Sequence, residues 1–343
     1  MTFDFELVGK IGSMALIDRK AGIIDYTRVA RLSRELRPGY IWVSSGATEI
    51  GRLDYMQRTG REIAGEHAKT DYAAQGQAIL MQTYRQFVDP AYSVRQVLVE
   101  HQHFNDEQKS EHLKGLLLRC REQNAIPIVN YNDAVSSEEN RRLELLALSH
   151  DKKRVFECVD NDETASRIAC LVRARTLLIF TSVDGIYLDP ENETTLVKTI
   201  SGKDAYELTE NIEEHKKYCV GASRAGANGA RAKLEYVKDA AAPYIASFFA
   251  KAPSDPALLH AERFNDLRRV VHEVGAGALF VVCLCARLRI GRSVHLKSRA
   301  REELSAVDAA VLCPEAARQF LDEGVHLRLG HPGEQQPQRD RRA

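Results

Sequence analysis

The stretch that decides the fold reads DNDETASRIACLVRARTLLIF and runs from Asp160 to Phe180. It opens with acid, amide and acid, continues as an apolar helical pattern over 163–173, and ends as a buried-strand pattern over 176–180. A polar turn, a helix and a strand in this order form one unit of an α/β fold. The clustered carboxylates repel one another unless a cation, a ligand or a helix N-terminus offsets them. The turn at 160–162 therefore predicts a binding partner.

The same alternation extends over most of the chain. Short apolar runs rich in Val and Ile alternate with longer helical patterns, which is typical of a mainly parallel sheet with helices on both faces. We therefore expect an α/β fold, a three-layer αβα sandwich around a mainly parallel central sheet. The sequence predicts strands at 40–44, 94–98, 126–130, 176–180 and 243–246, and helices at 25–36, 70–87, 106–123, 163–173 and 229–240.

The pattern also suggests a division of the chain. Two polar linkers, 136–153 and 189–214, are long enough to carry small excursions of their own or lids over a site. Past residue 253 the periodicity weakens, although a helix over 255–273 and a final strand over 279–284 fit the sequence. We expect one large domain over 1–250, a C-terminal extension over 251–330, and a disordered tail over 331–343.

Composition excludes several classes of function. Lys plus Arg and Asp plus Glu both number 48 among 343 residues, so no global basic surface favours nucleic acid. The seven cysteines are odd in number and include no C-x-x-C pair, which indicates a reducing, cytoplasmic compartment. No stretch approaches the roughly 18 apolar residues that a membrane-spanning helix needs. We expect no nucleic-acid partner and no membrane association.

Small-residue polar turns follow the predicted strands in succession. Glycine lets the backbone approach a phosphate, lysine supplies a point charge, and a helix N-terminus supplies amide donors. Each turn alone is explained as well by an ordinary surface turn or helix N-cap, but six in a row predict a phosphate-binding cleft. The turns are Lys10-Ile-Gly12-Ser13, Ser45-Gly46-Ala47, Asn130-Tyr-Asn132-Asp133, Asp160-Asn161-Asp162, Thr181-Ser182-Val-Asp184-Gly185-Ile-Tyr187, and 226–234 with Lys233.

The order of these turns resembles the amino acid kinase family, and within it the glutamate 5-kinase branch. The family pattern runs K-x-G-[ST], S-G-A, N-E-N-D, G-D-N-D, T-D-x-x-G-L-Y and G-T-G-G-M-x-T-K-L, and the resemblance covers residues 5–250. It implies an ATP-dependent kinase that transfers the γ-phosphoryl group to a carboxylate, most simply glutamate to glutamyl 5-phosphate. It also implies that Mg²⁺ arrives on ATP rather than at a metal site of the protein. We further expect a homo-oligomer.

The resemblance also assigns roles to residues. Lys10 and Lys233 would contact the transferring phosphoryl group and the ATP phosphates, and Asp162 would organise both lysines as the third catalytic residue. The acceptor would be held by Ser45, Gly46, Ala47, Asp133 and Asn161. The nucleotide would be held by Lys10, Gly12, Ser13, Thr181, Ser182, Tyr187, Asp189, Ala227, Asn228, Gly229, Ala230, Arg231, Ala232 and Lys233.

Three departures from the family pattern leave alternatives open. Ser182 replaces an acid, Tyr131 replaces a glutamate, and the turn at 226–230 reads GANGA in place of GTGGM. A nucleoside monophosphate acceptor, as in uridylate (UMP) kinases of the same fold, is the first alternative, although that branch usually has G-G-G-N where this chain has Ser44-Ser45-Gly46-Ala47. A non-catalytic nucleotide-binding regulatory protein is the second. Retention of Lys10, Asp162 and Lys233 argues against it.

Overall fold

The computed structural model describes residues 3–136, 138–151, 155–158, 160–181, 186–189, 192–197, 199–202, 204–219, 229–241, 246–251 and 280–284. Several expectations lie outside these residues, namely the helix over 255–273, the tail, and the site residues Ser182, Ala227 and Asn228. The division into a domain, an extension and a tail stays a prediction.

An eight-stranded sheet organises the described chain, in the order β10-β12-β11-β7-β1-β4-β6-β5. All neighbouring strands in it are parallel except β10 and β12, which pair antiparallel. Two short ribbons, β2–β3 and β8–β9, lie outside this sheet. The strands of the main sheet are β1 (Phe5–Ile11), β4 (Tyr40–Ser44), β5 (Ser93–Val99), β6 (Ala125–Tyr131), β7 (Ala174–Thr181), β10 (Thr199–Ser201), β11 (Ala246–Lys251) and β12 (Phe280–Leu284). The ribbon strands are β2 (Ile17–Asp18), β3 (Ile23–Ile24), β8 (Ile186–Tyr187) and β9 (Leu196–Val197).

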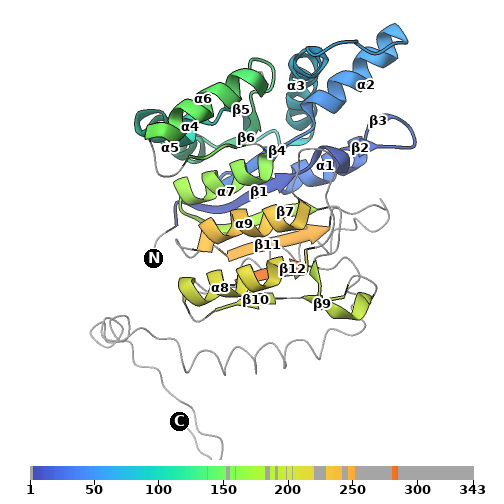
Figure 1. The fold of residues 1–343 in the computed structure, drawn as a ribbon. Coiled ribbons are helices and arrows are strands. Elements are labelled where there is room, and N and C mark those ends of the chain that lie inside the picture. The colour runs from blue at the N-terminus through green and yellow to red at the C-terminus, as the bar shows by residue number, and fades with distance from the viewer. Residues whose placement is uncertain are drawn as a thin grey trace, which may run out of the picture. The chain divides into compact units, whose positions relative to one another are not determined.

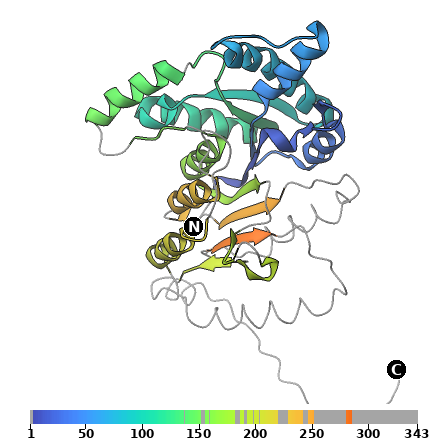
Figure 2. The same ribbon diagram turned by 45° about the vertical axis from the view of Figure 1, so that its right-hand side comes forward.

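Helices cover both faces of the sheet. In Figure 1, α7, α9 and α8 lie in that order along the near face, and in Figure 2 the same helices lie to the left of the strands. The helices are α1 (Tyr26–Glu35), α2 (Ala47–Thr59), α3 (Ala68–Phe87), α4 (Gln102–Asn105), α5 (Glu107–Glu122), α6 (Glu138–Asp151), α7 (Asn161–Leu171), α8 (Ala205–Lys216) and α9 (Gly229–Ala241). Short 3-10 turns are η1 (Ser13–Ala15) and η2 (Glu193–Thr195).

Alternation along the buried strands divides the core into two layers. In β4, Ile41 and Val43 belong to the core layer that also includes side chains of α5, α7, α8 and α9, whereas Trp42 belongs to the layer with α1, α2 and α3. In β7, Leu177 and Leu178 divide in the same way. Because successive side chains of a strand point to opposite faces, a run buried on both sides is apolar throughout. The structure confirms the predicted three-layer αβα fold with a mainly parallel sheet.

Helix α2 was not predicted, and its packing explains why. It meets α3 through Gly51 and Gly76, where an added Cβ on Gly76 would lie 1.8 Å from the carbonyl oxygen of Ala47. A helix that packs through glycine shows little of the apolar stripe by which helices are recognised. The residue immediately before α2 is Gly46, whose φ of 112° lies in the left-handed region that favours glycine.

Other boundaries differ modestly from expectation. The linker over 136–153 carries α6, and the linker over 189–214 carries η2, β9, β10 and most of α8. The strand expected at 243–246 is described from Ala246 onward, and the expected final strand at 279–284 is β12. Within the described part of the chain, no helix combines the length and apolarity needed to cross a membrane.

Candidate functional site

Strand ends and helix starts converge at one edge of the sheet. Parallel strands place their carboxyl ends at the same edge, and helices that lead into such strands begin there. Lys10 lies near the end of β1, Asp162 lies in the first turn of α7, and Lys233 lies in the second turn of α9. The turn after β4 adds Ser45, and the end of β6 adds Asn130. Residues more than 200 positions apart in sequence thus meet.

A buried carboxylate between two lysines forms the centre of the site. Lys10 Nζ lies 2.7 Å from Asp162 Oδ1, and Lys233 Nζ pairs with Asp162 Oδ2. Lys10 is 8% exposed and Asp162 is 3% exposed. Buried charges are stable only when paired, and here one carboxylate serves two ammonium groups. The cluster keeps net positive charge, which suits an anionic ligand such as phosphate.

The surroundings shift the pKa values of Asp162 and Asp160 in opposite directions. Burial opposes ionisation of Asp162, but Lys10 and Lys233 outweigh it and hold the pKa of this carboxyl below its usual range. Burial, reinforced by the charge of Asp162, raises the pKa of Asp160. The nearby phenol of Tyr236 also has its pKa raised, by burial first and by the neighbouring acids second. The lysines therefore act mainly on Asp162.

Asp160 is the N-cap of α7. Its Oδ1 accepts hydrogen bonds from the backbone N–H groups of Asp162 at 2.8 Å and Glu163 at 3.0 Å. Its Oδ2 accepts one from the hydroxyl of Tyr236 at 3.4 Å. A capping carboxylate satisfies amide donors that have no partner within the helix. The cap thus fixes the position from which Asn161 and Asp162 project.

Four polar side chains form a relay beside the lysines. Asn161 Nδ2 donates to Ser45 Oγ and to Asn130 Oδ1, both at 2.9 Å. Asn130 Nδ2 in turn donates to Gln77 Oε1 at 2.9 Å. Two atoms of the relay, Asn161 Oδ1 and Gln77 Nε2, are buried without a hydrogen-bond partner among the described residues. Such atoms carry a desolvation cost that a ligand could relieve.

The turn after β1 leaves space beside Lys10 because it contains Gly12. A Cβ on Gly12 would lie 3.6 Å from Lys10 Nζ, so the glycine keeps the approach to the ammonium open. The backbone N–H of Ser45 donates to the carbonyl oxygen of Ile11 at 3.1 Å, which joins the turn after β4 to the turn after β1. The two turns therefore border one space.

The structure brings together five of the residues singled out by sequence, namely Lys10, Ser45, Asp162, Asn161 and Lys233. Gly46 and Ala47 begin α2 next to Ser45, and Gly229, Ala230, Arg231 and Ala232 precede Lys233 in α9. Asp133 lies in the turn after β6, Ser13 in η1 and Thr181 at the end of β7. Tyr187 ends β8, and Asp189 follows it in the loop toward β9, where its backbone bonds to Asn192 and to the hydroxyl of Thr195. The functional roles of all these residues stay predictions.

Sequence reasoning missed Tyr236 and gave Gln77, Asn130 and Asp160 no role of their own. Gln77 and Tyr236 lie within helical patterns, where a polar side chain gives no sign of facing a site. Asp160 could have been recognised as an N-cap, because acids are preferred immediately before a helix. Contact across 53 positions, as between Gln77 and Asn130, leaves no local signal.

The lowered pKa of Asp162 predicts an acid-sensitive contribution to stability. Since the folded-state pKa lies below the unfolded value near 3.8, the ionised carboxylate stabilises the fold above that pH. This contribution is lost as the pH falls through the folded pKa. We expect the difference in unfolding free energy between the wild type and Asp162→Asn to shrink steadily below about pH 3.8, measured by urea unfolding at successive pH values. A constant difference down to pH 2 would contradict the lysine-stabilised ionisation.

The fold and the site together define a class of α/β protein, in which lysines at the carboxyl edge of a parallel sheet share a buried carboxylate. The chain belongs to the amino acid kinase family, whose model matches residues 6–244. A glutamate 5-kinase of Clostridium perfringens is 31% identical over 68% of this chain and 82% of its own length. Glutamate 5-kinase 2 of Bacillus subtilis is 29% identical over 80% of this chain and 67% of its own. Among solved structures, carbamate kinase from Giardia lamblia bound to AMP-PNP covers 80% of this chain and 98% of its own, with 12% identity and a TM-score of 0.47.

Proposed function

We propose that this protein is an ATP-dependent kinase that phosphorylates the side-chain carboxylate of an α-amino acid, converting glutamate to glutamyl 5-phosphate. Family membership and the two relatives at about 30% identity support phosphoryl transfer. ATP enters as its Mg²⁺ complex, so the metal belongs to the substrate. Within the described part of the chain, no group of three or more His, Cys, Asp or Glu side chains is placed to hold a metal ion.

The lysine–carboxylate centre accounts for the chemistry. Phosphoryl transfer depends on positioning and on neutralising charge at the transferring group more than on covalent help from the protein. Lys10 and Lys233 supply the positive charge, and Asp162 holds both ammonium groups at fixed positions. The acceptor carboxylate is already ionised near pH 7, so an oxygen of it attacks the γ-phosphorus without a general base while ADP leaves.

The direction of the hydrogen bonds in the relay indicates which phosphoryl acceptor fits the site. The backbone N–H of Tyr131 donates to Asn130 Oδ1 at 2.9 Å, and a backbone N–H is always a donor. This fixes Asn130 Oδ1 as the acceptor that meets Asn161, so Asn161 must present its Nδ2 there. Both hydrogens of Nδ2 are then used by Asn130 and Ser45.

Asn161 is left with a buried carbonyl oxygen that has no partner among the described residues. Such an oxygen can only accept, so a ligand that satisfies it must carry a donor. The ammonium group of an α-amino acid is a charged, strong donor, whereas the donors of UMP are the neutral ribose hydroxyls and uracil N–H, because its phosphate is mainly an acceptor near pH 7. The relay therefore favours glutamate over UMP. The non-catalytic alternative rests on the altered turn at 226–230, and it leaves the paired lysines without a purpose.

The test compares three acceptors with the purified full chain and Mg²⁺-ATP. ADP release should be seen with glutamate, should require at least about 100-fold more glutarate, which lacks the α-amino group, and should be absent with UMP. Trapping the product with hydroxylamine identifies an acyl phosphate. Turnover of UMP alone would overturn the proposal, equal use of glutarate and glutamate would overturn the relay argument, and binding of ATP without turnover of any acceptor would favour the regulatory alternative.

A further inference from the structure

Helices α7 and α9 contact each other through a series of three polar contacts. Asp162 pairs with Lys233, Ser166 Oγ donates to the carbonyl oxygen of Tyr236 at 2.5 Å, and Cys170 Sγ donates to the carbonyl oxygen of Asp239 at 3.4 Å. On α7 these residues are spaced by four, which keeps their side chains on one helix face, and on α9 they are spaced by three, with Tyr236 and Asp239 contributing backbone carbonyl groups. We call these contacts the ladder. The two helices run side by side in the same direction, with the catalytic pair at one end.

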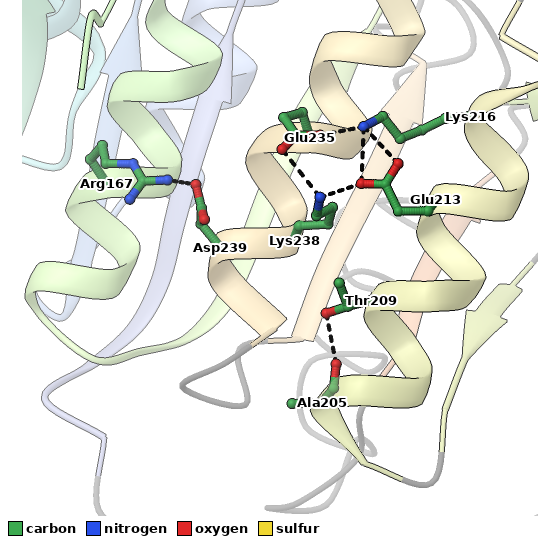
Figure 3. Close-up of polar contacts among 8 residues, drawn as sticks. All are labelled: Arg167, Ala205, Thr209, Glu213, Lys216, Glu235, Lys238 and Asp239. Atoms are coloured by element: carbon green, nitrogen blue, oxygen red, sulfur yellow. Dashed lines mark hydrogen bonds and ion pairs between the residues drawn. The ribbon is translucent and has the colours of Figure 1, made fainter. Parts of the chain in front are cut away.

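An ion pair closes the other end of the ladder. Arg167 pairs through Nη2 with Asp239 Oδ2, as Figure 3 shows, and the two side chains are only 9% and 20% exposed. The guanidinium carbon of Arg167 also lies 4.0 Å from the centre of the Phe156 ring. Phe156 is itself held by Asn105, which bonds both its backbone N–H and its carbonyl oxygen. Phe156 therefore holds the guanidinium group of Arg167 on one side while Asp239 pairs with it.

The opposite side of α9 is tied to α8 by a different network. Glu213 of α8 pairs with Lys216 and Lys238, and Glu235 of α9 pairs with the same two lysines (Figure 3). The carboxylates of Glu213 and Glu235 are about half exposed, at 46% and 48%. Lys216 and Lys238 are 12% and 22% exposed, but water reaches the two carboxylates and competes for them, so these pairs contribute less than a pair with both partners buried. This network therefore provides an internal comparison for the buried pair.

We propose that Arg167 and Asp239 are positioning residues that set the register of α9 against α7 and thereby hold Lys233 at Asp162. This inference rests on the proposed function for its kinetic consequences. Asp239 lies six residues beyond Lys233, about 9 Å along a rigid helix at 1.5 Å per residue. A translation or rotation of α9 at Asp239 is therefore transmitted to the ammonium group. A salt bridge has a directional geometry and therefore allows only one register between the two helices. Apolar contacts alone would restrict the register less.

The kinetic test compares Asp239→Asn with the matched control Glu213→Gln, which removes a charge on the other side of α9. A displaced Lys233 reaches the ATP phosphates poorly, so Asp239→Asn should raise the KM for ATP and lower kcat, each by about tenfold, since misplacement by 1 Å costs up to about 100-fold. The KM for glutamate should stay within about twofold, because the relay does not involve α9. Glu213→Gln should match the wild type.

A second readout does not depend on activity. The rate of acetylation of Lys233 by a water-soluble acetylating reagent, measured by mass spectrometry against exposed Lys20, reports whether its ammonium group is still paired. Asp239→Asn should increase this rate several-fold, and Glu213→Gln should not. If Asp239→Asn does not fold, Ser166→Ala removes one contact of the ladder without leaving a charge unpaired, and it should change both readouts in the same direction.

Unchanged acetylation of Lys233 together with an unchanged KM for ATP in a folded Asp239→Asn protein would overturn the inference. So would equal effects of Asp239→Asn and Glu213→Gln, because these would indicate general loosening of α9. If the wild type transfers no phosphoryl group, the proposed function fails, but a rise in acetylation at Lys233 would still support the positioning role. The two conclusions are therefore tested separately.

Discussion

Asp162→Asn is expected to lower kcat/KM for phosphoryl transfer by about a thousandfold or more. Asparagine keeps the size of the side chain but loses the charge that pairs with Lys10 and Lys233. The two ammonium groups would then repel each other in a buried place, and the amide would turn a donor toward one of them. Both lysines would leave the positions where charge develops on the transferring phosphoryl group. Initial rates of ADP release at varied ATP and glutamate measure the effect.

The matched control for this variant is Asp106→Asn. Asp106 is also an acid at a helix start, where it accepts from the backbone N–H of Lys109 at 2.9 Å, and asparagine caps helices equally well. Its rates should be unchanged. A folded Asp162→Asn enzyme that keeps more than about a tenth of the wild-type kcat/KM would contradict the central role of the carboxylate.

Gly76→Ala is expected to destabilise the fold by about 3 kcal/mol, although alanine is the better helix former. The added Cβ would lie 1.8 Å from the carbonyl oxygen of Ala47 and 2.4 Å from the backbone nitrogen of Gly51. These are backbone atoms of α2, so α2 and α3 must separate. Because α2 begins directly after Ser45 and Gly46, the acceptor turn would move with it. Urea unfolding gives the loss of stability, and the KM for glutamate reports the displacement of the turn.

Gly115→Ala in α5 provides the comparison. A Cβ there would approach only the Arg119 guanidinium, at 3.2 Å, and that side chain can move aside. Removing a glycine from a helix interior should then stabilise the protein by up to about 1 kcal/mol. Changes of opposite sign in the unfolding free energy for Gly76→Ala and Gly115→Ala would establish close helix packing as the cause. A neutral Gly76→Ala would show that α2 and α3 can separate without cost.

The strands and the site turns could be predicted because their signals are local. The apolar run at β7 and the polar turn at 160–162 can each be recognised from a few neighbouring residues. Because the strands are parallel, the turns that follow them must lie at the same edge of the sheet. The pairing of Lys10 and Lys233 with Asp162 was expected only through the resemblance to a family. Helix α2 escaped prediction because it meets α3 through Gly51 and close backbone contact, and glycine adds nothing to an apolar periodicity.

Sequence by itself determined the alternation of strands and helices, the succession of small polar turns, and the family to which the chain belongs. This was possible because a strand buried on both faces is a continuous apolar run, and a turn that needs backbone freedom contains glycine, so both show within a few neighbouring residues. Tertiary structure alone decided that Asn161 presents a carbonyl oxygen and that Arg167 meets Asp239. Hydrogen-bond polarity and helix register depend on partners distant in the chain, such as Asn130 for Asn161, and those partners become neighbours only when the sheet and its helices pack.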